Sequence, residues 1–232
     1  MAPHDGMAPH DGMAPHDGMA SPPTRVLATP HQETHGPVMS TALQRPWRRM
    51  TVAEFLDWEP DDRSGALWQL RDGEPEMMAP ASDAHGSIHA VLVQLLGVHL
   101  DAQGMGCRAV IAPGVVPSQR SEENCLVPDL GVTRTPPTGE HLMHEPLVLF
   151  EILSPSNVSK TRLNVRGYMT IPSVQEIVVL RSTAISAEVL RRMPDGGWPR
   201  EPELVGDDGT LRLDSIGFAV PLPALYRTTG LA

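Results

Sequence analysis

Residues 147–153 read LVLFEIL, an apolar segment that contains a single acidic residue. An unbroken apolar run of this length is typical of a central strand that is covered on both faces. Glu151 interrupts the run, at a position where an ionised carboxylate is costly to bury unless it is paired or bound to a metal ion. The stretch therefore predicts an internal strand that carries one chemically unusual side chain.

The segments before this strand predict two helices and a hairpin. Thr51 and Glu54 have the spacing of a capping box, which predicts a short helix over 51–58. Asp72-Gly73 lies between the extended segments 66–70 and 74–78, which is typical of a β-hairpin turn. Ser82 or Asp83 can cap a longer helix that reaches about Leu100. Its apolar residues recur at helical spacing: Ile88, Val91, Leu92, Leu95 and Leu96.

The remaining segments alternate between strands and helices. We expect strands at 107–116, 126–134 and 146–153, a helix at 159–170, and a hairpin of strands at 175–181 and 185–192. Loops rich in Gly and Pro are expected over 194–209, and a last short element over 210–225. This order predicts an α/β (α+β) domain over 46–232, in which a mixed β-sheet is flanked by helices.

The first 45 residues differ from the rest in composition. MAPHDG is repeated three times over residues 1–18, and Pro, Ser, Thr and His remain frequent to about residue 45. Such a segment cannot bury enough apolar surface to offset its ordering entropy, so residues 1–45 are expected to be a disordered tail. Its histidines could bind a transition metal loosely. An expanded repeat, or an upstream mis-assigned start with Met39 or Met50 as the true one, is favoured over metal binding by these histidines.

Composition limits the class of protein. The formal net charge of −10 argues against a non-specific nucleic-acid coat, which needs clustered Lys and Arg. No apolar run is long enough to predict a transmembrane helix, and no signal peptide is predicted. Cys107 and Cys125 are expected to be free thiols in a reducing cytoplasm.

Two carboxylates stand out as candidate ligands. Asp129 follows Val127-Pro128 early in one expected strand, and Glu151 lies near the end of the next. Carboxylates on adjacent strands can share one divalent cation, and Mg²⁺ prefers such oxygen ligands together with water and a substrate phosphate. An Asp after Pro is also a common turn former. The pair nevertheless predicts a Mg²⁺ (or Mn²⁺) site suited to phosphodiester hydrolysis.

The chain from about 50 to 192 resembles the restriction endonuclease family of the Uma-two type, within the PD-(D/E)XK nuclease superfamily. The matching stretches are MTVAEFL (50–56), LRDGEPEMMAPASDAHGSIHAVL (70–92), LVPDLGV (126–132), LVLFEILSPSN (147–157) and GYMTIPSVQEIVVL (167–180). The resemblance implies a restriction-endonuclease-like core with Asp129 and Glu151 as Mg²⁺ ligands. The main-chain carbonyl of Ile152 is a further candidate ligand.

The chain departs from the superfamily pattern at its lysine. The signature position two residues after Glu151 holds Leu153. Many relatives carry an Asp and a Lys in the following helix instead, and those places hold Lys160 and Asn164. Lys160 is the single lysine of the chain and could reach the site from the same helix face as Asn164, or lie in solvent.

Other polar side chains near these segments are less specific. His85 matches a histidine common in the family, so it is a candidate to line the site, although a hydrogen-bonded histidine at the rim of the core explains it too. His89 shares its helix face, but a zinc site lacks an obvious third ligand. Glu74 and Glu76 are expected to be solvated, and Tyr168 is expected to close a core.

Two hypotheses for function follow. The first is a Mg²⁺-dependent endonuclease acting on DNA, with Lys160 or Asn164 positioning water or the scissile phosphate. The alternative is a catalytically degenerate binding or accessory module with the nuclease fold, which the missing signature lysine and the acidic balance favour. A homodimer is compatible with either hypothesis.

Overall fold

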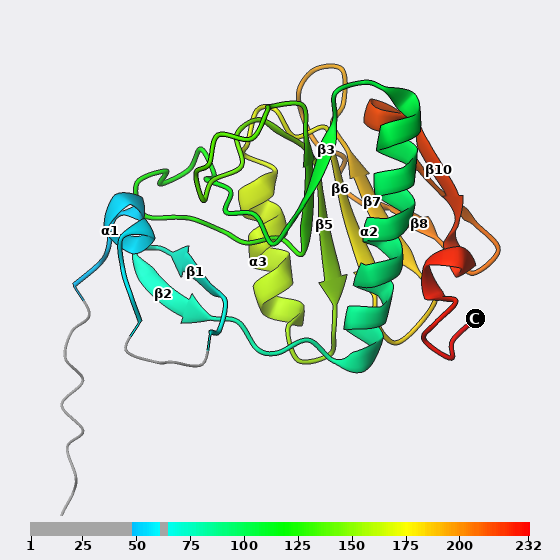
Figure 1. The fold of residues 1–232 in the computed structure, drawn as a ribbon, viewed down its shortest axis with the longest axis horizontal. Coiled ribbons are helices and arrows are strands. Elements are labelled where there is room, and N and C mark those ends of the chain that lie inside the picture. The colour runs from blue at the N-terminus through cyan, green and yellow to red at the C-terminus, as the bar shows by residue number, and fades with distance from the viewer. Residues whose placement is uncertain (1–47, 61–64) are drawn as a thin grey trace, which may run out of the picture. The chain divides into compact units, whose positions relative to one another are not determined.

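The computed structural model describes residues 48–60 and 65–232 (Figure 1). The predicted disordered tail, 1–45, lies outside these residues. Arg45–Ala232 belongs to one folded unit, to which everything below refers. None of the helices in the described ranges is long and apolar enough to cross a membrane.

The central sheet contains six strands in the order β3-β4-β5-β6-β7-β8. The strands are β3 (Arg108–Ile111), β4 (Leu130–Thr133), β5 (Pro146–Leu153), β6 (Glu176–Arg181), β7 (Ala187–Arg191) and β8 (Glu203–Val205). The sheet is mixed, because β5 and β6 are parallel while the other neighbours are antiparallel. The predicted mixed sheet with β5 as an internal strand is therefore confirmed.

Side chains of β5 alternate between two cores, one on each face of the sheet. Val148, Phe150 and Ile152 pack in the core that contains α2 (Asp83–Gln103). Leu149 and Leu153 pack in the core that contains α3 (Val158–Tyr168). Figure 1 shows the two helices on either side of the β5–β6 pair. Glu151 follows the same alternation and so lies on the α3 side.

The N-terminal part of the unit forms a small sheet beside α3 (Figure 1). The sheet is the hairpin of β1 (Trp68–Arg71) and β2 (Glu74–Met77). The same part of the unit contains α1 (Val52–Leu56), which has the predicted capping box. Asp72 and Gly73 have φ of 49° and 77°, the left-handed pair that a two-residue hairpin turn requires. Leu70 and Cys125 exchange two main-chain hydrogen bonds of 2.8 and 3.0 Å, which attach the hairpin to the larger unit.

The C-terminal part contains more structure than the sequence predicts. The expectation of loops throughout 194–209 is wrong, because β8 forms there and pairs with β7. A three-residue edge strand has too few alternating positions to be recognised in a Gly- and Pro-rich segment. Beyond it, β9 (Thr210–Leu213) and β10 (Phe218–Pro221) form a hairpin with the short helices η1 (Asp214–Ile216) and η2 (Leu222–Tyr226), all contributing to the α2 core.

The other predicted elements are confirmed with small shifts of their ends. The strand expected at 107–116 stops at Ile111, because Ala112 takes a φ of 46° ahead of Pro113-Gly114. The helix after Ser82 reaches Gln103, and 187–191 pairs with 176–181 as a hairpin. Cys107 and Cys125 are free thiols.

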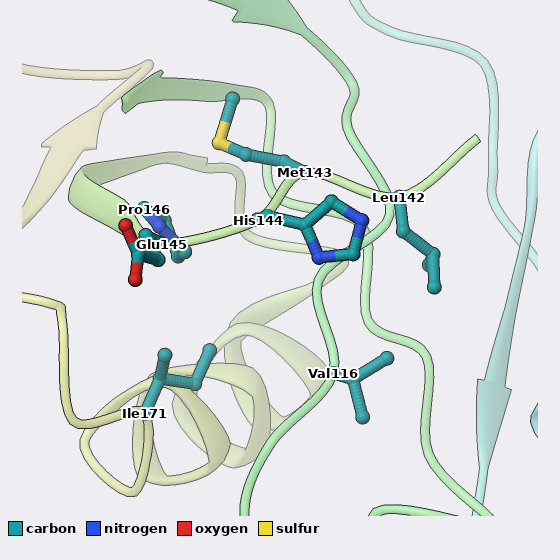
Figure 2. Close-up of a pocket in the computed structure, with 7 residues that line it drawn as sticks. All are labelled: Val116, Leu142, Met143, His144, Glu145, Pro146 and Ile171. Carbon is teal, nitrogen blue, oxygen red and sulfur yellow. The ribbon is translucent and has the colours of Figure 1, made fainter. Parts of the chain in front are cut away.

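A pocket of about 330 Å³ lies at the start of β5 (Figure 2). Pro146 begins the strand here, whereas Glu151 lies near the strand's other end. The lining side chains are Val116, Leu142, Met143, His144, Glu145, Pro146 and Ile171. This pocket therefore contains none of the candidate site residues.

Candidate active site

Asp129 and Glu151 come together across the β4–β5 pair. Leu130 is opposite Phe150 in the antiparallel register, so the next residues outward are Asp129 and Glu151. The amide of Ile152 donates to Asp129 Oδ2 at 2.6 Å. The His85 Nε2 atom, from α2, lies 3.0 Å from Asp129 Oδ1. Asp129 is thus fixed by a strand and by a helix.

Glu151 is buried, with 5% of its surface exposed. Its Oε1 accepts hydrogen bonds from the Tyr168 hydroxyl at 2.6 Å and from Asn164 Nδ2 at 3.1 Å. Asn164 and Tyr168 are four residues apart on α3, so they share the helix face that looks onto β5. Within 48–60 and 65–232 no donor forms a hydrogen bond with the second oxygen, Oε2.

This environment favours the protonated form of Glu151. Burial and, after it, the charge of Asp129 raise the pKa of Glu151 to about 8, against the hydrogen bonds from Tyr168 and Asn164 and the charge of Arg71. Burial and the charge of Glu151 raise the pKa of Tyr168 well above 10, so its hydroxyl remains a donor. Two adjacent carboxylates, one with a raised pKa, are a common sign of a functional or cation-binding site.

The β1–β2 hairpin completes the surroundings of Glu151. Arg71 Nη2 donates to Asn164 Oδ1 at 2.5 Å, and Asn164 Nδ2 lies 3.3 Å from Gln69 Oε1. Glu76 Oε2 in turn accepts from Gln69 Nε2 at 3.0 Å and from Arg71 Nε at 3.2 Å. The expectation that Glu76 is simply solvated is wrong, because the side chain opposite it in the hairpin binds it; Glu74 is exposed as expected.

Lys160 lies on the exposed side of α3, one turn before Asn164. The pKa of Glu76 is raised by burial, but hydrogen bonds from Gln69 and Arg71 and the charges of Arg71 and Lys160 bring it below its usual value. The charge of Lys160 therefore lowers the pKa of Glu76. The cation whose charge lowers the pKa of Glu151 is Arg71. The structure brings Asp129, Glu151, His85 and Asn164 together, and it leaves Lys160 at the margin.

Sequence reasoning did not identify Gln69, Arg71 or the hydroxyl of Tyr168 as site residues. The alternation of strand β1 could have identified Gln69 and Arg71. Strand β1 alternates, so Gln69 and Arg71 share one face while Leu70 is buried on the other. What the sequence lacks is any indication that this face meets α3, about ninety residues further along the chain.

The histidines of α2 do not form a zinc site. The His85 and His89 rings are 6.4 Å apart at an interplanar angle of 89°. Burial lowers the pKa of His89, and its buried Nε2 has no hydrogen-bond partner among the described residues. Over 48–60 and 65–232, no three His, Cys, Asp or Glu side chains form a ligand group. The donors present are two carboxylates, which suit Mg²⁺ completed by water rather than Zn²⁺.

Residues 52–223 match the family described as "Uma2: Putative restriction endonuclease". The chain belongs to the Uma2 family. The match spans α1 through the first residues of η2, and so includes every side chain of the site described above. The predicted family is confirmed.

Two relatives extend this result. The Uma2 chain is 27% identical over 190 residues to the protein described as "Uncharacterized protein slr1290" of Synechocystis, covering 81% of this chain and 95% of that protein. The crystal structure of a "putative nuclease belonging to DUF820" from Anabaena variabilis superimposes with a TM-score of 0.61. It is 17% identical and covers 77% of this chain and 98% of the other. This likeness confirms the fold, a restriction-endonuclease-like core.

Proposed function

We propose that this protein is a Mg²⁺-dependent endonuclease that hydrolyses phosphodiester bonds of DNA at the Asp129–Glu151 pair. One observation carries the proposal: a buried glutamate lies opposite an aspartate, and its pKa is raised first by burial and then by the charge of that aspartate. A divalent cation is the species that would stabilise both carboxylates in their charged forms. Membership of the Uma2 family supports nuclease chemistry for such a cation.

The donor set fits Mg²⁺, or Mn²⁺ in its place. Glu151 Oε2 receives no hydrogen bond within the described ranges, and Asp129 Oδ1 retains lone-pair capacity beside His85. The carbonyl of Ile152 is the candidate third protein ligand. Mg²⁺ held there would polarise a phosphate oxygen and lower the pKa of a bound water.

Neighbouring main-chain and side-chain groups would hold these ligands in place. The Ile152 amide and His85 fix the two oxygens of Asp129, and Tyr168 and Asn164 fix Oε1 of Glu151. Rigid carboxylates lose little entropy on binding a cation or on positioning a phosphate. Asn164 can donate to a water or a phosphate oxygen only by leaving Glu151 or Gln69, which makes it a positioning residue rather than a substitute for a lysine charge.

Substituting Glu151 tests the proposal. Glu151→Gln keeps the side-chain shape and removes the charge, so we expect loss of Mg²⁺ binding by calorimetry and loss of cleavage of supercoiled DNA. Glu74→Gln makes the same charge change at an exposed residue and should leave both unchanged. Metal should stabilise the wild type by about 2.7 kcal/mol at a hundredfold excess over its dissociation constant. An equal thermal response of wild type and Glu151→Gln would exclude Glu151 as a ligand.

The accessory-module hypothesis has one observation in its favour. The side chains that contact or neighbour Glu151 include two uncharged amides, Asn164 and Gln69, and the charge of Lys160 lowers the pKa of Glu76 rather than that of Glu151. A wild-type protein that binds metal yet never cleaves DNA would establish this alternative. If the wild-type protein cleaves DNA, Lys160→Ala tests the role of this lysine. Loss of turnover with unchanged metal affinity would give Lys160 the role of the signature lysine.

A further inference from the structure

We propose that Arg71, on the N-terminal hairpin, binds a backbone phosphate of DNA beside Glu151 and supplies the positive charge that the signature position, occupied by Leu153, does not. The proposal rests on the proposed function, because it assigns Arg71 to the same site. Arg71 would thus contact the substrate itself.

The first argument is the position of the guanidinium. Only 15% of the Arg71 side chain is exposed, and its Nη2 atom lies 2.5 Å from Asn164 Oδ1, whose amide nitrogen contacts Glu151. Arg71 is therefore one side chain away from the candidate metal ligand. Charge interactions are stronger in such a partly desolvated place than on an open surface.

The second argument is the number of donors. A guanidinium carries five N–H donors in a planar fork that matches phosphate oxygens. The described contacts use two of its nitrogen atoms, Nε towards Glu76 and Nη2 towards Asn164. No described residue bonds Nη1, so donors remain for a phosphate while the existing bonds hold the fork in place.

The third argument is how Arg71 orients Asn164. Because Arg71 has only donors, the oxygen of the Asn164 amide must face it. The amide nitrogen must then face Gln69 Oε1 and Glu151 Oε1, as observed. A lysine at position 164 would bring its own charge to Glu151. Here Asn164 carries no charge, and it connects Arg71 to Glu151 by accepting a hydrogen bond from the first and donating one to the second.

Glu76 is the competitor for the same charge. Its Oε2 lies 3.2 Å from Arg71 Nε, and the two side chains are diagonal neighbours in the hairpin. A phosphate at Arg71 would meet repulsion from this carboxylate. Removing the charge of Glu76 should therefore strengthen DNA binding through Arg71, whereas removing that of exposed Glu74 should do so far less.

The test is the salt dependence of DNA binding. Fluorescence anisotropy with a labelled duplex in Ca²⁺, with the probe checked on a gel for cleavage, gives the slope of log affinity against log salt. Loss of one phosphate contact should lower the magnitude of that slope by about 0.9. We expect this for Arg71→Ala, and a retained slope for Arg71→Lys. Arg120→Ala is the control, because Arg120 is 60% exposed and pairs with Asp72 in the turn of the same hairpin.

A double-mutant cycle separates binding from a purely structural role. Glu76→Gln should tighten binding several-fold in the wild type and not in Arg71→Ala, with Glu74→Gln as the matched charge control. A structural Arg71 would change the thermal midpoint in Arg71→Ala and Arg71→Lys but leave the salt slope at the wild-type value, which would overturn the proposal. So would a wild type that binds no DNA. A wild type with an Arg71-dependent slope but no Mg²⁺-dependent cleavage would refute the proposed endonuclease and leave the Arg71 assignment standing.

Discussion

At the scale of the residue, Glu151 is the side chain whose unusual state can be predicted from the sequence alone. An acidic residue inside LVLFEIL must be compensated, and the structure identifies the compensating groups as Tyr168, Asn164 and, at longer range, Arg71. These partners come from a helix and a hairpin that the sequence predicts as elements but does not place. Glu151 and Asn164 were therefore predictable as site residues, whereas Arg71 and the hydroxyl of Tyr168 were not.

Glu151 should make the stability of the metal-free protein fall as pH rises. An unfolded glutamate ionises near its ordinary pKa of 4.5, whereas burial and Asp129 raise the folded pKa to about 8. Between these values the folded state holds a proton that the unfolded state has released, so the free energy of unfolding decreases with pH until both are ionised. Each unit of such a shift is worth about 1.4 kcal/mol.

Denaturant unfolding in EDTA at pH 5, 6.5 and 8.5 measures this effect. Glu151→Gln cannot ionise and should lose less stability across the series, so that it becomes more stable than wild type at pH 8.5. Parallel pH profiles for the two proteins would mean that Glu151 is already ionised at low pH in the folded state.

At the scale of the element, local sequence signals predict the type and the ends of most helices and strands. Short edge strands and the packing of elements against one another depend on tertiary contacts. The Thr51 capping box, the Asp72-Gly73 turn and the Ser82 cap each predicted a boundary that the structure confirms. The strand β8 was missed because three residues gain their structure from β7 rather than from their own pattern. The docking of the hairpin was also missed, since Leu70 and Cys125 are joined by main-chain bonds that depend little on side-chain identity.

The hairpin turn should be sensitive to a methyl group at Gly73. A Cβ there would lie 2.7 Å from Arg49 Cβ, and the residue has a φ of 77°. Gly104 has a comparable φ of 60°, and a Cβ added to it would meet no atom within 4 Å, so it isolates the conformational cost of a left-handed residue, about 1–2 kcal/mol. Gly73→Ala should destabilise the protein more than Gly104→Ala in denaturant unfolding. Because the turn sets the position of Arg71, only Gly73→Ala should also weaken DNA binding; equal effects of the two variants would contradict the tight contact with Arg49.

At the scale of the whole molecule, the acidic balance and the site are compatible. The net charge of −10 argues against strong non-specific binding, so under the proposed function DNA affinity should depend on a divalent cation and a few arginines rather than on a basic surface. The fold was predictable to the level of a mixed sheet between helices because β5 is so strongly apolar. The strand order was not, because it depends on which strands pair over long sequence separations, such as β5 with β6 across α3.

Deleting the N-terminal segment should leave the stability of the Arg45–Ala232 unit unchanged. The MAPHDG repeats contain no apolar side chain larger than Met, so they offer no face that could add to a hydrophobic core. A chain that starts at Met39 should unfold at the same thermal midpoint as the full-length protein, and so should one that lacks only residues 1–18. For a unit of this size, about 1 kcal/mol of lost stability lowers the midpoint by roughly 2–4 °C. A larger drop on starting at Met39, with no drop on removing 1–18, would show that residues 19–38 contact the folded unit.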